Sequence, residues 1–136
     1  CEHLLEACAQ LARDLLQAGR KSTIVATSRE PLHVPGEATL PVAPLPAPEP
    51  AGDLAPDALC GYAAVQLFLD RAIDASPDFA LTRKNAAAVA RICRELDGIP
   101  LALELAAARA RSMSIDAIAD RAGIAKGSGN PRMIST

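Results

Sequence analysis

Apolar residues recur every three or four positions over most of this chain, which is the spacing of one face of an α-helix. The first such run predicts a helix over residues 2–18, and Gly19 ends it because glycine readily adopts the left-handed conformation that closes helices. Its apolar stripe consists of Leu4, Leu5, Cys8, Leu11, Ala12, Leu15 and Leu16. The same spacing predicts later helices over residues 57–75, 83–96 and 100–111, and a short one after Ser114.

A different pattern follows the first helix. Residues 22–26 read Ser-Thr-Ile-Val-Ala, a short β-branched run bounded by polar residues, which is typical of a buried strand. The chain is therefore expected to open with an α/β portion, built from a helix, a tight turn and a strand, and to continue as a mainly α-helical part.

Prolines punctuate the middle of the chain between residues 31 and 56. Proline fixes φ and removes a backbone donor, so this stretch is predicted to be a linker or surface loop, with room for a short edge strand over residues 38–42. The expected organisation is an α/β part over 1–32, a linker over 33–56, a helical part over 57–122 and a flexible tail over 123–136.

Composition narrows the function classes. Half of the residues are hydrophobic but only 2% are aromatic, and the net charge is −2 with no run of Lys or Arg, which argues against direct nucleic-acid binding. The longest apolar run, Ile99 to Ala108, is far shorter than the roughly 20 residues that cross a bilayer, so no membrane partner and a cytoplasmic location are expected. The four cysteines lack metal-binding spacing, and no metal site is predicted.

Three segments, in this order, resemble the NB-ARC/STAND ATPases of bacterial LuxR/AfsR-like transcriptional regulators. Residues 1–7 (CEHLLEA) look like the stretch that follows the Walker B aspartate, and residues 24–32 (IVATSREPL) resemble the family's sensor strand. Residues 96–109 resemble the Gly-Leu-Pro-Leu motif of the helical ARC subdomain, with Ile99 replacing the commoner Leu. The resemblance implies a remnant of a P-loop NTPase core followed by an ARC-like subdomain, acting as a nucleotide-dependent switch.

The resemblance also implies roles for individual residues. Arg29, with Ser28, would sense the γ-phosphate, since a planar guanidinium suits phosphate oxygens. Pro100 would pack on adenine, with Ile99 and Leu101 shaping the pocket. The catalytic candidates, beside the attacking water or the metal, are Glu2 and His3. Simpler interpretations stay open: a solvated charge for the arginine, a helix-capping carboxylate for the glutamate, and an ordinary first-turn proline.

The phosphate-binding loop G-x-x-x-x-G-K-[ST] is absent from the sequence. Together with a start at Cys1, this leads us to expect an internal fragment of a P-loop ATPase that is inactive alone and holds no nucleotide tightly. In the parent protein, ATP or ADP with Mg and the regulator's other domains are the expected partners. After Ala122 the sequence departs from the family pattern, as a truncation or frameshift would make it. The alternatives are a nucleotide-independent helical interaction module and a non-functional truncated product.

Overall fold

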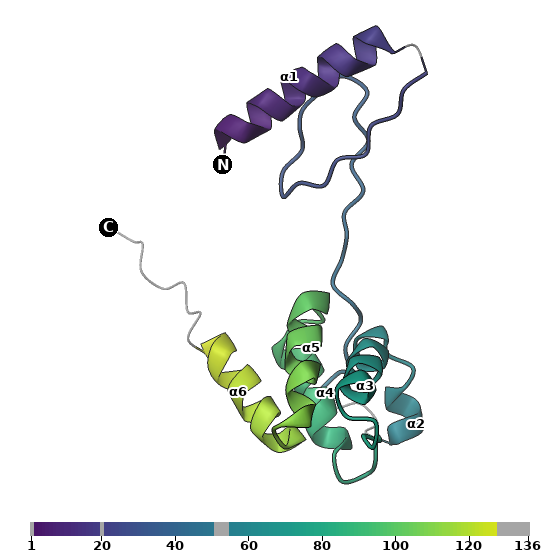
Figure 1. The fold of residues 1–136 in the computed structure, drawn as a ribbon, viewed down its shortest axis with the longest axis vertical. Coiled ribbons are helices and arrows are strands. Elements are labelled where there is room, and N and C mark those ends of the chain that lie inside the picture. The colour runs from purple at the N-terminus through teal and green to yellow at the C-terminus, as the bar shows by residue number, and fades with distance from the viewer. Residues whose placement is uncertain (1, 20, 51–54, 128–136) are drawn as a thin grey trace, which may run out of the picture. The chain divides into compact units, whose positions relative to one another are not determined.

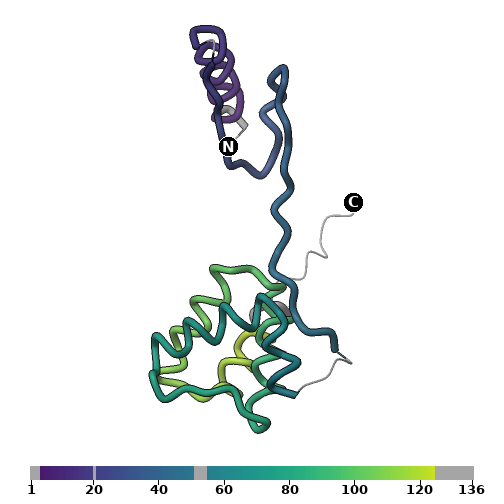
Figure 2. The backbone as a smooth tube through the Cα atoms, turned by 90° about the vertical axis from the view of Figure 1, so that its right-hand side faces the viewer, coloured from purple at the N-terminus to yellow at the C-terminus, as the bar shows by residue number. Residues whose placement is uncertain are grey.

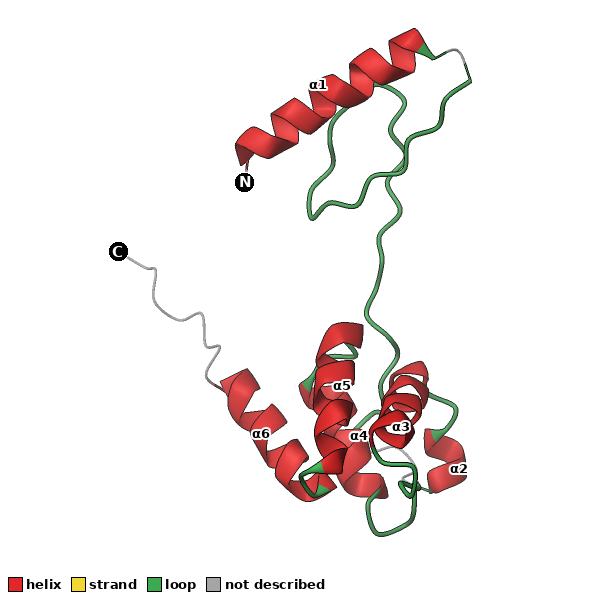
Figure 3. Cartoon of the chain, in the orientation of Figure 1, coloured by secondary structure: helices red, strands yellow, loops and turns green. Residues whose placement is uncertain are grey.

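The computed structural model describes residues 2–19, 21–50 and 55–127 and divides the chain into two units, Cys1–Val42 and Ala43–Thr136 (Figure 1). Every regular element among the described residues is helical (Figure 3). The elements are α1 (Glu2–Ala18), α2 (Pro56–Leu59), α3 (Ala63–Ala75), α4 (Ala86–Glu95), α5 (Pro100–Ala107), the 3-10 helix η1 (Ala108–Arg111) and α6 (Ile115–Gly127).

The first unit contains the predicted opening helix, and α1 confirms it. The Gly19 N–H still donates to the Leu15 carbonyl oxygen at 3.0 Å, and the chain then turns away. On the polar face, Gln10 donates a side-chain hydrogen bond to Asp14 at 2.8 Å. Among the described residues of this unit only Ala9 and Ala12 are buried, so most of the predicted apolar stripe of α1 is exposed.

The predicted α/β portion is wrong. Residues 22–26 form no strand, and neither do residues 38–42; both segments run as exposed loop, with the Val25 side chain 89% exposed. A strand stabilises its backbone by pairing with a neighbour, and the described part of the chain offers none. The β-branched residues have a high strand propensity, but propensity alone does not form a strand when no neighbouring strand is present to pair with it.

The second unit packs its helices around one apolar core. The backbone tube shows these helices gathered in one bundle (Figure 2). In this arrangement α3 packs mainly on α5, and α4 mainly on α6. Phe68 is fully buried, and its ring meets that of Phe79 edge-on with a centroid distance of 6.4 Å. The largest other side chains that are fully buried are Leu59, Ile92, Leu103, Val65 and Val89.

Part of the Pro-rich stretch belongs to this helical unit. The Leu45 N–H donates to the Gly98 carbonyl oxygen at 2.9 Å, and the Ala64 N–H donates to the Pro46 carbonyl oxygen at 3.1 Å. Pro48 is fully buried. These contacts tie the extended residues to the turn before α5 and to the start of α3, so the proline ring contributes to the core.

The helix boundaries differ in detail from the sequence expectation. The helix predicted over 57–75 is two helices, α2 and α3, because the chain turns at Cys60–Tyr62. Helix α6 runs to Gly127, and the rest of the predicted tail, 128–136, lies outside the described residues. No helix within the described ranges is long and apolar enough to cross a membrane.

Candidate functional site

The connection between α4 and α5 positions the residues predicted to meet adenine. Helix α4 closes with two nested backbone hydrogen bonds, from the Gly98 N–H to the Cys93 oxygen at 3.1 Å and from the Asp97 N–H to the Arg94 oxygen at 3.0 Å. This is the Schellman pattern of helix termination. Both Asp97 and Gly98 have positive φ, +51° and +64°. The turn therefore reverses the chain within two residues and starts α5 immediately.

Pro100 occupies the first turn of α5, where its missing N–H leaves no hydrogen bond unmade and its fixed φ suits the helix. Ile99, just before it, has an extended backbone and accepts the Leu103 N–H at 3.0 Å. The two faces of α5 then differ sharply. Leu103 and Ala107 are fully buried, whereas Ile99 is 49% and Leu101 64% exposed. Ile99, Pro100 and Leu101 thus form an exposed apolar edge, the α5 edge, on a well-anchored helix.

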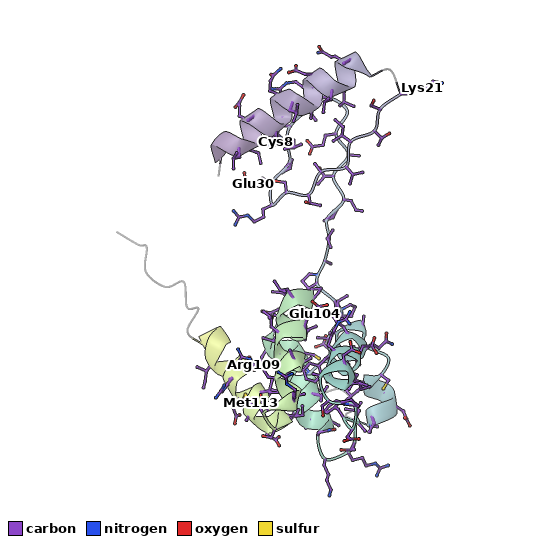
Figure 4. The ribbon with its side chains drawn as sticks, in the orientation of Figure 1. Cys8, Lys21, Glu30, Glu104, Arg109 and Met113 are labelled. Atoms are coloured by element: carbon purple, nitrogen blue, oxygen red, sulfur yellow. The ribbon has the colours of Figure 1, made fainter. Side chains whose placement is uncertain are left out.

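Ser28 and Arg29 lie together in the first unit. They line a groove of about 430 Å³ between α1 and the loop that follows it, with apolar lining from Leu4, Leu5, Cys8, Ala26 and Leu32. Cys8 and Glu30, which also line it, are labelled in Figure 4. The Ser28 hydroxyl accepts the Glu30 N–H at 3.3 Å, which shapes the loop locally. Arg29 is exposed. The groove combines a cation, hydroxyls and an apolar wall.

Glu2 and His3 fall in the first turn of α1, but their side chains lie outside the described part of the structure, so the catalytic assignment stays a prediction. Ser28 and Arg29 thus belong to the Cys1–Val42 unit, and residues 99–101 belong to the Ala43–Thr136 unit.

The three cysteines Cys8, Cys60 and Cys93 in the described ranges are all free thiols. No group of three or more His, Cys, Asp or Glu side chains there is arranged to hold a metal ion. Burial raises the pKa of the Cys93 thiol to about 12, so this thiol stays protonated at neutral pH. Cys93 lies in the core, whereas Cys8, which the sequence placed in the apolar stripe of the first helix, is exposed.

A second groove of the helical unit was missed by the sequence reasoning. It lies between α5 and α6, has a volume of about 230 Å³, and is lined by Leu96, Ala102, Leu105, Ala106, Arg109, Ile118, Arg121 and Ala122. The sequence did contain a pattern that indicates this face, because Leu101, Leu105 and Arg109 follow one another at the four-residue spacing of one side of a helix. The spacing alone does not show whether another helix covers that side of α5 or leaves it exposed.

Fold and site together define a small helical domain that presents an apolar helix edge. Putative HTH-type transcriptional regulator Rv0890c of Mycobacterium tuberculosis (strain ATCC 25618 / H37Rv) is 51% identical over 120 residues, covering 88% of this chain and 12% of that protein. Putative HTH-type transcriptional regulator Mb0914c of Mycobacterium bovis matches to the same extent. Uncharacterized protein Rv0894 of Mycobacterium tuberculosis is 44% identical over 114 residues, covering 84% of this chain and 26% of that protein.

The chain therefore spans about an eighth of the length of the regulators that it matches, and about a quarter of the uncharacterised relative. No family model matches it, and no solved structure is significantly similar to it.

Proposed function

We propose that this chain is the part of a bacterial transcriptional regulator in which bound nucleotide controls contacts between domains. Identity of 51% to proteins named as HTH-type transcriptional regulators supports the regulatory role. The net charge of −2, without any cluster of Lys or Arg along the sequence, supports assigning DNA contact to other parts of such a regulator. In this proposal the helical unit passes the effect of bound nucleotide to other domains, and it does not itself bind DNA.

The single observation that carries the proposal is the α5 edge. Ile99 and Leu101 are exposed beside Pro100, while the opposite side of the same helix is fully buried. Exposed apolar side chains that are fixed on a packed helix suit a partner with an apolar face, because contact removes their surface from water without ordering a loop. A purine base has such a face. Adenine of ATP or ADP is the proposed occupant.

Arg29 and Ser28 are proposed to bind phosphate oxygens. A guanidinium stays charged at all relevant pH values and presents a planar set of donors that matches phosphate. Arg29 is exposed at a groove that also contains the hydroxyls of Thr27 and Ser28, which supports this role. Mg²⁺ would accompany the nucleotide and neutralise phosphate charge when bound.

The competing function is a helical interaction module that ignores nucleotide. The same exposed apolar side chains support it, because a protein surface also buries Ile99 and Leu101. The two functions differ in what replacing Pro100 does to nucleotide affinity.

The test uses the mycobacterial regulator with its matching 120 residues replaced by the corresponding residues of this chain. Calorimetric titration with MgATP and MgADP should give lower affinity for both nucleotides in Pro100→Ala, by up to about ten-fold, because two methylene groups that would contact the base are lost. The fold should persist, since alanine is a strong helix former.

Arg29→Ala should instead weaken MgATP by about ten-fold or more and leave MgADP nearly unchanged, since a charge-assisted hydrogen bond contributes about 1.5–3 kcal/mol. Arg83→Ala, at an exposed arginine between α3 and α4, is the control and should change neither affinity. Unaltered binding of both nucleotides in both Pro100→Ala and Arg29→Ala would reject the nucleotide role and leave the interaction module.

A further inference from the structure

The groove between α5 and α6, called the α5–α6 groove below, has an apolar floor. Leu105 is 60% exposed there, and the remaining apolar lining comes from Leu96, Ala102, Ala106, Ile118 and Ala122. The groove lies between two packed pairs of helices, because α5 packs mainly on α3 and α6 mainly on α4. Exposed leucine beside a concave apolar floor is a favourable place for another apolar side chain.

The charges at this groove all have one sign. Its lining includes Arg109 and Arg121 and no Asp or Glu. Both arginines are exposed, and neither takes part in a salt bridge among the described residues. Arg109 is labelled in Figure 4, at the end of the helical stretch that begins with α5.

On α5 and α6, two acidic residues that adjoin lining residues are bound by arginines of other helices. Glu104, next to Leu105, accepts the Arg71 guanidinium of α3 at 3.3 Å. Asp120, next to Arg121, accepts the Arg91 guanidinium of α4 at 2.9 Å. Asp116 lies one helical turn before Asp120 and therefore on the same side of α6. Glu104 and Asp120 thus face α3 and α4, and the side chains that line the groove carry only positive charge.

The size of the groove favours side chains over a whole cofactor. About 230 Å³ is less than the roughly 300–1,000 Å³ of typical small-molecule pockets. A furrow between two helices, with apolar floor and charged rim, instead fits the way an amphipathic helix inserts one row of side chains into a groove. Specificity then comes from the charges at the rim.

We infer that the α5–α6 groove is a docking site for an acidic amphipathic helix of a partner protein. Apolar side chains of the partner, one helical turn apart, occupy the floor beside Leu105 and Ile118, and carboxylates of the same helix pair with Arg109 and Arg121. This docking site shares no lining residue with the α5 edge and does not depend on nucleotide.

The test uses the whole 136-residue chain without nucleotide and two synthetic helical peptides of roughly 15 residues, the length at which isolated helices begin to be stable. Both carry leucines at i, i+4 spacing; one has glutamates flanking the leucines, and the other has lysines at the same positions. Fluorescence anisotropy should show the glutamate peptide binding more tightly by a few-fold to about ten-fold, the range that two exposed ion pairs together contribute.

Variants connect the binding to the groove. Arg109→Glu combined with Arg121→Glu should reverse the preference, so that the lysine peptide binds more tightly. Arg83→Glu combined with Lys84→Glu changes the net charge equally in the exposed loop before α4 and should leave the preference as it was. Leu105→Ala should weaken both peptides, and since this side chain is exposed the fold should be unaffected.

Amide chemical shifts give the location, which is important because α1 also exposes leucines. Shifts should change at α5 and α6 on adding the glutamate peptide. Failure of the glutamate peptide to bind, equal affinity for the two peptides, an unchanged preference in the double arginine variant, or shift changes confined to the Cys1–Val42 unit would each overturn the inference.

Discussion

At the turn between α4 and α5, Gly98 is buried, has a φ of +64° and lies against the backbone of Leu45. A Cβ at this position would overlap the Leu45 carbonyl oxygen and approach the Leu45 backbone nitrogen to 3.2 Å. The left-handed conformation disfavours side chains, and the close approach adds a steric demand. Glycine is therefore required at this residue for two reasons: the turn needs a positive φ, and the backbone of Leu45 leaves no room for a Cβ.

Gly98→Ala should lower the free energy of unfolding of the helical unit by about 1–3 kcal/mol, the range for a non-glycine residue held in a sparsely populated backbone region. The measurement is urea denaturation followed by circular dichroism at the helical signal. Gly61→Ala is the matched control, because Gly61 has no positive φ and an added Cβ would lie 3.3 Å from the Ala58 oxygen. An equal loss in the two variants would contradict the special role of Gly98.

At the scale of the element, α5 combines a packing face with an exposed face. Leu103 and Ala107 lie in the core beside the buried residues of α3, while Leu101 and Leu105 lie outside, among the most exposed large apolar residues of the helical unit. Arg71 on α3 forms ion pairs with both Asp74 of its own helix and Glu104 of α5. The hydrogen bonds to these carboxylates raise the pKa of Arg71, and the bond to Asp74 has the larger effect. The core face thus fixes the position of the helix, and the outer face is left for contact.

Leu103→Ala should destabilise the unit by about 2–5 kcal/mol, since a fully buried leucine loses its transfer free energy and leaves a cavity. Leu101→Ala, the same substitution two residues earlier, should change stability by less than about 0.5 kcal/mol, because the side chain is 64% exposed. Chemical denaturation of both variants measures the contrast. Similar losses would mean that Leu101 is covered in solution.

At the scale of the whole chain, the two units differ in how many of their apolar side chains are buried. The Ala43–Thr136 unit has a core of fifteen buried residues drawn from its helices. In the Cys1–Val42 unit, residues 21–31 are all exposed. Local stability follows buried apolar contact, so the two units should open at different free energies.

Hydrogen exchange should therefore show the amides of α4, whose buried side chains include Val89, Ile92 and Cys93, as the most protected, and those of residues 22–30 as exchanging fast. Amide exchange followed by NMR or mass spectrometry measures this directly. Greater protection in residues 2–27 than in α3 to α6 would show that the first unit is the more stable one.

Local sequence determined the parts of this protein that depend on near neighbours. The apolar spacing predicted α1 with both ends, and it predicted separate helices over 83–96 and 100–111, where the structure has α4 and α5. Helix periodicity could be predicted because it involves contacts within about four residues. Pro100 was correctly placed in the first turn of α5 for the same reason. The site residues 99–101 were found through the family resemblance, and their role as an adenine contact stays a prediction.

Tertiary structure decided what depends on distant neighbours. The β-branched run at 22–26 has strand propensity, but a strand needs a partner to satisfy its backbone, and the described chain provides no sheet. Leu101 and Leu103 are both leucines on the same helix. Only the packing of α3 against α5 decides that Leu103 is buried and Leu101 exposed. The positive α5–α6 groove likewise arises because Arg71 and Arg91, more than twenty residues from their partners in sequence, bind Glu104 and Asp120.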